Sequence, residues 1–178
     1  TMLVLDEGAK LRHRTAQPLW FMLSCLTHDF GKAICTEEKD GVLHAYQHEI
    51  KGLPLIEVFL RRITKEVKLI EYVLNLAEYH MKPNTVARAR SAKKVTTRMY
   101  DLAVDPEGLL CIALADDRGR ITQEPAADHE SFLYERLEVF RELMARPYVM
   151  GKDLVEAGLR PGVEFTEILK HAHKLRLA

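Results

Sequence analysis

The chain has 178 residues, 47% of them hydrophobic and 29% charged, which is the balance of one domain, or two small ones, able to bury a core. Twenty-six Lys and Arg residues balance 26 Asp and Glu residues, and this zero net charge argues against indiscriminate coating of nucleic acid. No long apolar run occurs, so we expect no membrane span, and we expect no secretory signal. The three cysteines lack Cys-x-x-Cys spacing, which suits a cytoplasmic protein.

Helical periodicity dominates the chain. An apolar stretch from Pro18 to Thr27 comes first, and apolar residues then recur at threes and fours over 53–63, 67–77 and 132–144. Pro54 either kinks its helix or occupies the first turn. Neither alternating β-type runs nor paired Asn-Gly turns appear. We therefore predict an all-α protein of about seven to nine helices.

Breaks in the periodicity suggest a domain division. The linker-like segment Gln123–Asp128 predicts a helical domain over 1–126 and a smaller helical extension over 127–178, which is a candidate for tRNA contact. Shorter breaks fall at Asp40–Gly41, Met81–Pro83 and Asp105–Gly108.

The most informative motif is His28-Asp29, which closes the first apolar helix and leads into Gly31-Lys32. Adjacent imidazole and carboxylate groups suit Mn²⁺, Fe²⁺, Ni²⁺, Zn²⁺ or Mg²⁺. Lys32 is a candidate phosphate ligand. Taken alone, the doublet is more often a solvated pair at a helix end.

Three further sets change that balance. His44 and His48 would share a face of a helix, His80 ends a predicted helix, and Asp116-Asp117 ends another. Each set alone is more often a polar cap or a packed histidine. Together, four helix ends that present ligand-type side chains are typical of a helical metallohydrolase site.

The segment Thr27-His28-Asp29-Phe30-Gly31-Lys32 resembles the signature of the HD phosphohydrolase superfamily. More specifically, the chain looks like the HD domain of bacterial CCA-adding tRNA nucleotidyltransferases and their poly(A)-polymerase relatives. The other segments behind this resemblance are His48-x-x-x-Gly52, Ala77-Glu78-Tyr79-His80, Ala115–Arg120 and Gly151–Leu169.

This resemblance implies a helical bundle of the HD type with His28, Asp29 and Asp116 as metal ligands. Asp116 is preferred to Asp117 because the family pattern reads Ala-Asp-x-Arg-Gly-Arg. The family's first ligand, an earlier histidine, is expected one place before Thr1.

His13 does not match that first ligand, since it lies too close to the doublet in a basic, loop-like context. The residues with implied catalytic roles are Asp29, Lys32, His48 and His80.

The implied activity is metal-dependent phosphohydrolysis of the 2′,3′-cyclic phosphodiesterase, 2′-nucleotidase or phosphatase type. The cofactor would be a divalent metal: Ni, Mn, Mg, Fe or Zn. The implied partners are tRNA or RNA 3′ ends, nucleotide phosphoesters, and an N-terminal nucleotidyltransferase domain whose motifs are absent from these residues.

Two alternatives stay open. One is a non-catalytic, tRNA-binding helical body, since a stretch without acidic residues carries Lys82, Arg88, Arg90, Lys93, Lys94 and Arg98. That stretch is equally a solvated, flexible loop, and Arg120 either binds phosphate or pairs with Asp117. The other alternative is a free-standing nucleotide phosphohydrolase, against which the segment Gly158–Glu164 speaks.

Overall fold

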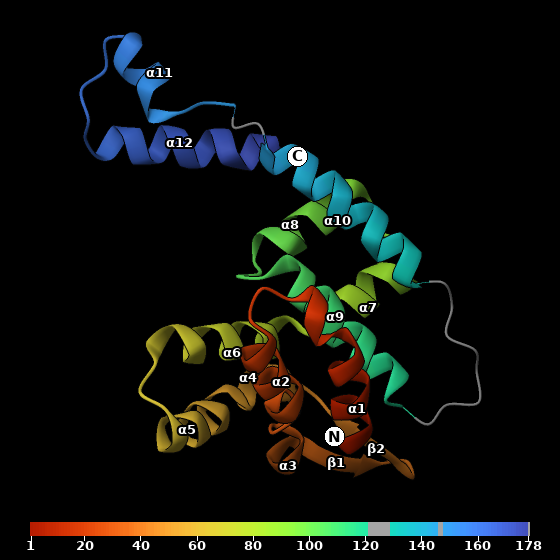
Figure 1. The fold of residues 1–178 in the computed structure, drawn as a ribbon. Helices are drawn as coiled ribbons and strands as arrows, with labels where there is room; N and C mark the ends of the chain where they lie inside the picture. The colour runs from red at the N-terminus through yellow and green to blue at the C-terminus, as the bar shows by residue number, and fades with distance from the viewer. Residues whose placement is uncertain (121–128, 146–147, 178) are drawn as a thin grey trace.

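The structure is a computed structural model that describes residues 1–120, 129–145 and 148–177. Within these residues it is a helical bundle with one small hairpin, so the predicted all-α fold class is confirmed (Figure 1). The elements are α1 (Met2–Leu11), η1 (Arg12–Arg14), α2 (Pro18–Thr27), α3 (Lys32–Cys35), β1 (Thr36–Lys39), β2 (Val42–Ala45), α4 (His48–Lys51), α5 (Leu53–Ile63), α6 (Val67–Tyr79), α7 (Met81–Arg88), α8 (Lys93–Asp101), α9 (Pro106–Arg118), α10 (His129–Ala145), α11 (Gly151–Glu156) and α12 (Val163–Arg176).

The periodicity did not predict the hairpin. β1 and β2 pair antiparallel, and the turn between them has Asp40 at φ 55° and Gly41 at φ 75°. Two successive positive φ values suit the tight turns that match the twist of a hairpin, and Asp-Gly is a favoured pair for them. His44 therefore lies on β2, and the expectation that it shares a helix face with His48 was wrong.

Helix α9 forms the centre of the bundle. Every residue from Gly108 to Asp116 is buried, because this helix is apolar on nearly all its faces. Helices α1, α2, α6, α7, α8 and α10 pack around it. At its start, Asp105 accepts a hydrogen bond from the Gly108 amide at 2.9 Å, and Pro106 occupies the first turn. The consequence is that the last turn of α9 carries Asp116 into the interior.

Prolines also begin α2 and α5. Pro18 and Pro54 lie in the first turns of α2 and α5, where a missing amide hydrogen costs nothing. Of the two readings of Pro54, the first-turn position is the one observed. Helix α2 runs from Pro18 to Thr27 along the core. His28, the residue that follows its end, is therefore buried inside the bundle.

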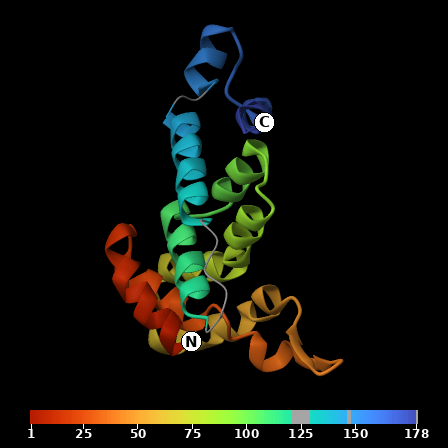
Figure 2. The ribbon, with the colours of Figure 1, turned by 90° about the vertical axis from the view of Figure 1, so that its right-hand side faces the viewer.

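Helix α10 shares the core of the preceding helices. Phe132, Leu133, Leu137 and Phe140 are buried in the same apolar cluster as α9. Helices α11 and α12 project from the far end of the bundle (Figure 2). The linker predicted at 123–128 lies outside the described residues, and the division at residue 126 stays a prediction.

The C-terminal end of α12 returns to α8 and α10. His173 Nε2 lies 2.8 Å from a carboxylate oxygen of Asp101, and the Thr97 hydroxyl donates to the carbonyl of Leu177 at 3.2 Å. These contacts hold α12 to the end of the bundle away from the hairpin. In the part of the chain that the structure describes, no helix is both long and apolar enough to cross a membrane.

Candidate metal centre

Four polar side chains from different helix ends meet inside the bundle. His28 follows α2, His48 begins α4, His80 separates α6 from α7, and Asp116 lies in the last turn of α9. All four are buried, with at most 5% of each residue exposed. Asp29, next to His28, is only partly buried and completes the cluster. Buried polar groups of this density need partners, so their contacts decide what the cluster can do.

The three histidines are oriented by the same local contact. In each, Nδ1 lies within hydrogen-bonding distance of a backbone carbonyl three residues earlier: Cys25 for His28 at 3.0 Å, Ala45 for His48 at 2.8 Å and Ala77 for His80 at 2.6 Å. When Nδ1–H donates to that carbonyl, the lone pair of a neutral imidazole lies on Nε2. This backbone contact is the usual way in which a histidine ligand is held for a metal.

Asp29 lies where the three Nε2 atoms converge. Its Oδ1 is 3.2 Å from Nε2 of His48 and 3.9 Å from Nε2 of His80, and its Oδ2 is 3.4 Å from Nε2 of His28. Lys32 Nζ reaches the same Oδ2 at 2.6 Å. Ligand atoms of His28, Asp29 and His80 all lie within 4.8 Å of one another.

Four of these atoms lack a hydrogen-bond partner among the described residues. They are Nε2 of His28, His48 and His80, and Oδ1 of Asp29, and all four are buried. Leaving such atoms unsatisfied costs about 1–3 kcal/mol each. A divalent cation is the group that three imidazole nitrogens and a carboxylate suit best, so the donor set fits a metal.

Asp116 lies at the edge of the cluster. Its Oδ1 is 3.7 Å from Nε2 of His28, while its Oδ2 accepts a hydrogen bond from Arg120. Asp117 faces away, toward Arg88 at 3.9 Å. The expected alternative of an Arg120–Asp117 pair was therefore wrong, because one helical turn brings Arg120 back to Asp116.

A contact between two glycines brings α4 to the cluster. A Cβ on Gly31 would overlap the carbonyl of His48, and a Cβ on Gly52 would lie 2.7 Å from the amide nitrogen of Gly31. Only glycines permit this approach of the backbones, which carries His48 to Asp29. The sequence motifs contain both glycines, but their contact is visible only in the fold.

The electrostatics of the cluster keep Asp29 ionised and shift the pKa values of His28 and His80 in opposite directions. Burial by itself lowers the pKa of His28, but the nearby carboxylates of Asp116 and Asp29, 3.7 and 3.4 Å from its Nε2, raise it to about 9. Burial opposes ionisation of Asp29, yet its contacts with His28 and His48 hold the pKa of that carboxyl far below its usual range. Burial, together with the charge on His28, lowers the pKa of His80 to about 4.

Without metal, these shifts make stability depend on pH. The pKa of His28 is raised from 6.5, so its contribution is complete below pH 6.5 and is lost as the pH rises through about 9. The pKa of His80 is lowered, so the unfolded state binds this proton at a higher pH than the folded state does. The free energy of unfolding therefore falls as the pH drops from 6.5 toward about 4. We expect the free energy of unfolding of chelator-treated protein, measured by urea titration, to be highest near pH 6.5.

The variant Asp116→Asn is the control for this profile. It removes a charge that raises the pKa of His28, so the decline in stability between pH 6.5 and 8 should become shallower. A slope identical to that of the wild type in this range would contradict the role of His28.

The predicted RNA-binding residues of the stretch 82–98 lie on α7, α8 and the turn between them, so the flexible-loop reading of this stretch was wrong, whereas Arg120 follows the end of α9. Among the described residues, five of them form no ion pair: Lys82, Arg90, Lys93, Lys94 and Arg98. Lys82 lies over the ring of Tyr79 at 4.6 Å, and Arg90 over Phe132 at 5.2 Å.

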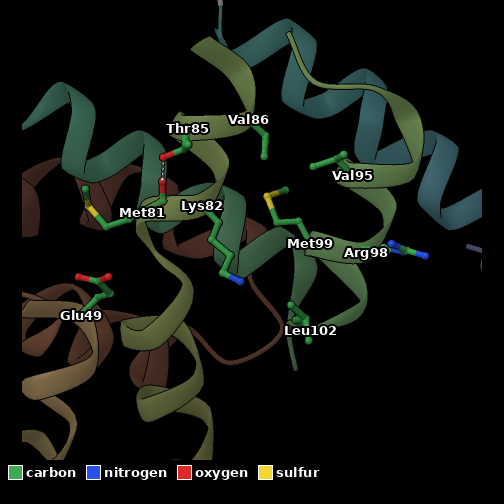
Figure 3. Close-up of a pocket in the computed structure, with 9 residues that line it drawn as sticks. All are labelled: Glu49, Met81, Lys82, Thr85, Val86, Val95, Arg98, Met99 and Leu102. Atoms are coloured by element: carbon green, nitrogen blue, oxygen red, sulfur yellow. Dashed lines mark hydrogen bonds between the residues drawn. The ribbon is translucent and has the colours of Figure 1, made fainter. Parts of the chain in front are cut away.

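The sequence reasoning missed Glu49. Its carboxylate lies 3.7 Å from Nδ1 of His48 and is directed toward Met81 of α7 (Figure 3). Its position directly after His48 in the chain was the available signal.

Comparisons with known proteins give a consistent answer. The Multifunctional CCA protein of Pseudomonas aeruginosa PAO1 is 32% identical over 177 residues, which cover 95% of this chain and 39% of that protein. The protein of the same name from Actinobacillus pleuropneumoniae serotype 5b is 24% identical over 187 residues, covering 99% of this chain and 41% of that protein.

No family model matches the chain, and no solved structure matches it. The chain spans about two fifths of the length of these curated relatives. Over nearly its whole length, it is therefore a homologue of one segment of the proteins named Multifunctional CCA protein.

Proposed function

We propose that this chain is the metal-dependent phosphohydrolase part of a CCA-adding tRNA nucleotidyltransferase, and that it hydrolyses 2′,3′-cyclic or terminal phosphoesters of RNA-type ends. The observation that carries the proposal is the set of four buried ligand atoms without a hydrogen-bond partner among the described residues. The resemblance to the HD superfamily and the name of the relatives support the same assignment.

In this proposal His28, Asp29 and Asp116 hold the cation, with Nε2 of His80 also facing it. Three imidazoles beside the carboxylates favour Mn²⁺, Fe²⁺, Ni²⁺ or Zn²⁺ over Mg²⁺. When bound, such a cation supplies Lewis-acid activation of the phosphoester and of water.

The other side chains act on the phosphate directly. Lys32 Nζ, now paired with Asp29, carries a charge that a phosphate oxygen can share. The carboxylate of Asp29, whose Oδ1 lies 3.2 Å from Nε2 of His48, raises the pKa of that imidazole and so favours the protonated form that can donate to a phosphate oxygen. Both groups would stabilise the charge that develops in the transition state.

The structure also suggests how to test the ligand expected before Thr1. Val4 in α1 packs against Gly119, three residues after Asp116. A histidine added before Thr1 would therefore lie near the end of α9 that carries Asp116.

The experiment measures metal content and hydrolysis of bis-p-nitrophenyl phosphate and 2′,3′-cyclic AMP with Ni²⁺ or Mn²⁺, with and without the added histidine. We expect turnover that a chelator removes and metal restores, and that the added histidine increases. Absence of both bound metal and turnover in the two forms would contradict the proposal.

The second candidate, a tRNA-binding helical body, is favoured by the five cations on α7, α8 and their turn that form no ion pair with described residues. Binding through phosphate contacts falls steeply with salt. In the same samples, tRNA binding that weakens with salt and in the Lys93→Glu/Lys94→Glu double variant, without any hydrolysis, would select this candidate. Binding insensitive to both changes would exclude it.

A further inference from the structure

Two arginines at the end of α9 have side chains of equal exposure but different partners. Arg118 and Arg120 are each 37% exposed. Arg118 donates a hydrogen bond to the carboxylate of Glu130 in α10 at 2.5 Å. Arg120 donates to Oδ2 of the buried Asp116. Of these two guanidinium groups, that of Arg120 is therefore the one in contact with the candidate metal centre.

The backbone after α9 determines where the Arg120 side chain begins. The amide of Arg120 donates to the carbonyl of Asp117 at 3.3 Å, so the helical turn continues past the end of α9. A Cβ on Gly119 would lie 2.9 Å from the amide nitrogen of Val4, so α1 packs directly against this turn. Side chains four residues apart on a helical turn share a face, which brings Arg120 to Asp116.

The two oxygens of Asp116 have different contacts as a result. Oδ2 accepts the hydrogen bond from Arg120, while Oδ1 lies 3.7 Å from Nε2 of His28. Two atoms that each bind one cation at about 2.1 Å are at most about 4.2 Å apart, so this separation suits two ligands of the same ion. Because the hydrogen bond to Oδ2 restricts rotation of the carboxylate, Oδ1 keeps its position toward His28.

A guanidinium group beside a metal ligand has two opposing effects. It orients the carboxylate, and the loss of such an outer partner typically lowers metal affinity by about 10- to 100-fold. It also repels a cation, but water and salt screen this repulsion because the Arg120 side chain is 37% exposed. The orienting effect is therefore the larger of the two.

We propose that Arg120 is a positioning residue of the candidate metal centre, which holds Oδ1 of Asp116 toward the cation through its contact with Oδ2. Lys32 has a similar contact with Oδ2 of Asp29, so each carboxylate of the cluster has one outer cation. The inference rests on the proposed function, because it takes Asp116 as a metal ligand. It gives Arg120 a role other than the RNA contact expected from the sequence.

The test compares variants of the two arginines. Calorimetric titration of metal-free protein with Ni²⁺ or Mn²⁺ measures the Kd of the metal. We expect this Kd to rise about tenfold in Arg120→Gln. Arg118→Gln is the matched control, since it removes an equally exposed guanidinium group that pairs with Glu130, and its Kd should stay within about twofold of the wild type. Arg120→Lys keeps the charge on a more flexible stem, so its Kd should rise about threefold.

A double-mutant cycle with Asp116→Ala shows whether Arg120 acts through Asp116. In that background Arg120→Gln should change the Kd by less than about twofold, because the carboxylate that it positions is absent. With saturating metal, the KM for bis-p-nitrophenyl phosphate should be the same in Arg120→Gln and the wild type, because a positioning residue does not touch the substrate.

Circular dichroism melting verifies that the variants fold, and if Arg120→Gln does not fold, Arg120→Lys takes its place in the comparison. A Kd equal to that of the wild type, or a lower one, would overturn the proposal, as would a tenfold effect that persists in Asp116→Ala. A raised KM with an unchanged Kd would also overturn it, because Arg120 would then contact the substrate phosphate.

The metal titration separates this inference from the proposed function. If the metal binds but neither bis-p-nitrophenyl phosphate nor 2′,3′-cyclic AMP is hydrolysed, the proposed function fails, while the Kd values still test the role of Arg120. If wild-type protein binds neither Ni²⁺ nor Mn²⁺, both proposals are overturned.

Discussion

Asp29→Ala should lower metal-dependent hydrolysis of bis-p-nitrophenyl phosphate by about 10²- to 10³-fold. The reason is that, among the residues that the structure describes, Asp29 is the single carboxylate whose oxygens lie within 4 Å of all three histidine Nε2 atoms. The same variant should bind Ni²⁺ or Mn²⁺ at least about tenfold more weakly by calorimetry. Loss of metal binding, measured without substrate, separates a lost ligand from a lost substrate contact.

Asp117→Ala is the matched control. Asp117 is a neighbouring carboxylate that faces Arg88 at 3.9 Å rather than the cluster. It should keep both metal affinity and turnover within about twofold of the wild type, because only an exposed ion pair is lost. If Asp29→Ala retains full metal affinity, Asp29 is not a ligand and the proposed site is wrong.

Gly31→Ala should destabilise the protein by about 2–3 kcal/mol or more and weaken metal binding at the same time. A Cβ at this position meets the carbonyl of His48 and lies 2.9 Å from the amide nitrogen of Gly52, both backbone atoms that cannot rotate away. Helix α4 must shift, and His48 moves from Asp29 as a result. Urea titration measures the stability, and calorimetry with Ni²⁺ measures the binding.

Gly151→Ala is the control for this substitution. Gly151 begins α11, and a Cβ there has open space around it. Its effect on stability should stay within about 0.5 kcal/mol, and metal affinity should not change. A Gly31→Ala protein as stable as the wild type would show that the approach of α4 does not depend on this glycine.

Much of the candidate site follows from local sequence. His28, His80 and Asp116 each stand at the end of an apolar stretch, and a helix that ends inside a bundle must leave its last polar residues there. The type of side chain at such an end is encoded directly. This is why composition and spacing alone predict a set of buried metal-ligand types.

Other parts of the site depend on contacts between distant residues. The family resemblance already favours Asp116 over Asp117, but the burial of Asp116 and its pairing with Arg120 follow from the rotation of α9 in the core. The sequence shows the Asp40–Gly41 turn only as a break in the helical periodicity, because four-residue strands give too little alternation to be recognised. A groove between α7 and α8 is lined by residues of these two helices together with Glu49 of α4 and Leu102. No local pattern in the sequence groups these residues together.

The sequence by itself determined the helical class of this protein, its apolar central helix and the chemical types of its candidate ligands, because periodicity and residue chemistry are local properties. Only the tertiary structure decided that three Nε2 atoms converge on Asp29 and that Gly31 and Gly52 allow that convergence. The physical reason is that these features arise from the packing of backbones and helix ends, and packing depends on all the helices at once.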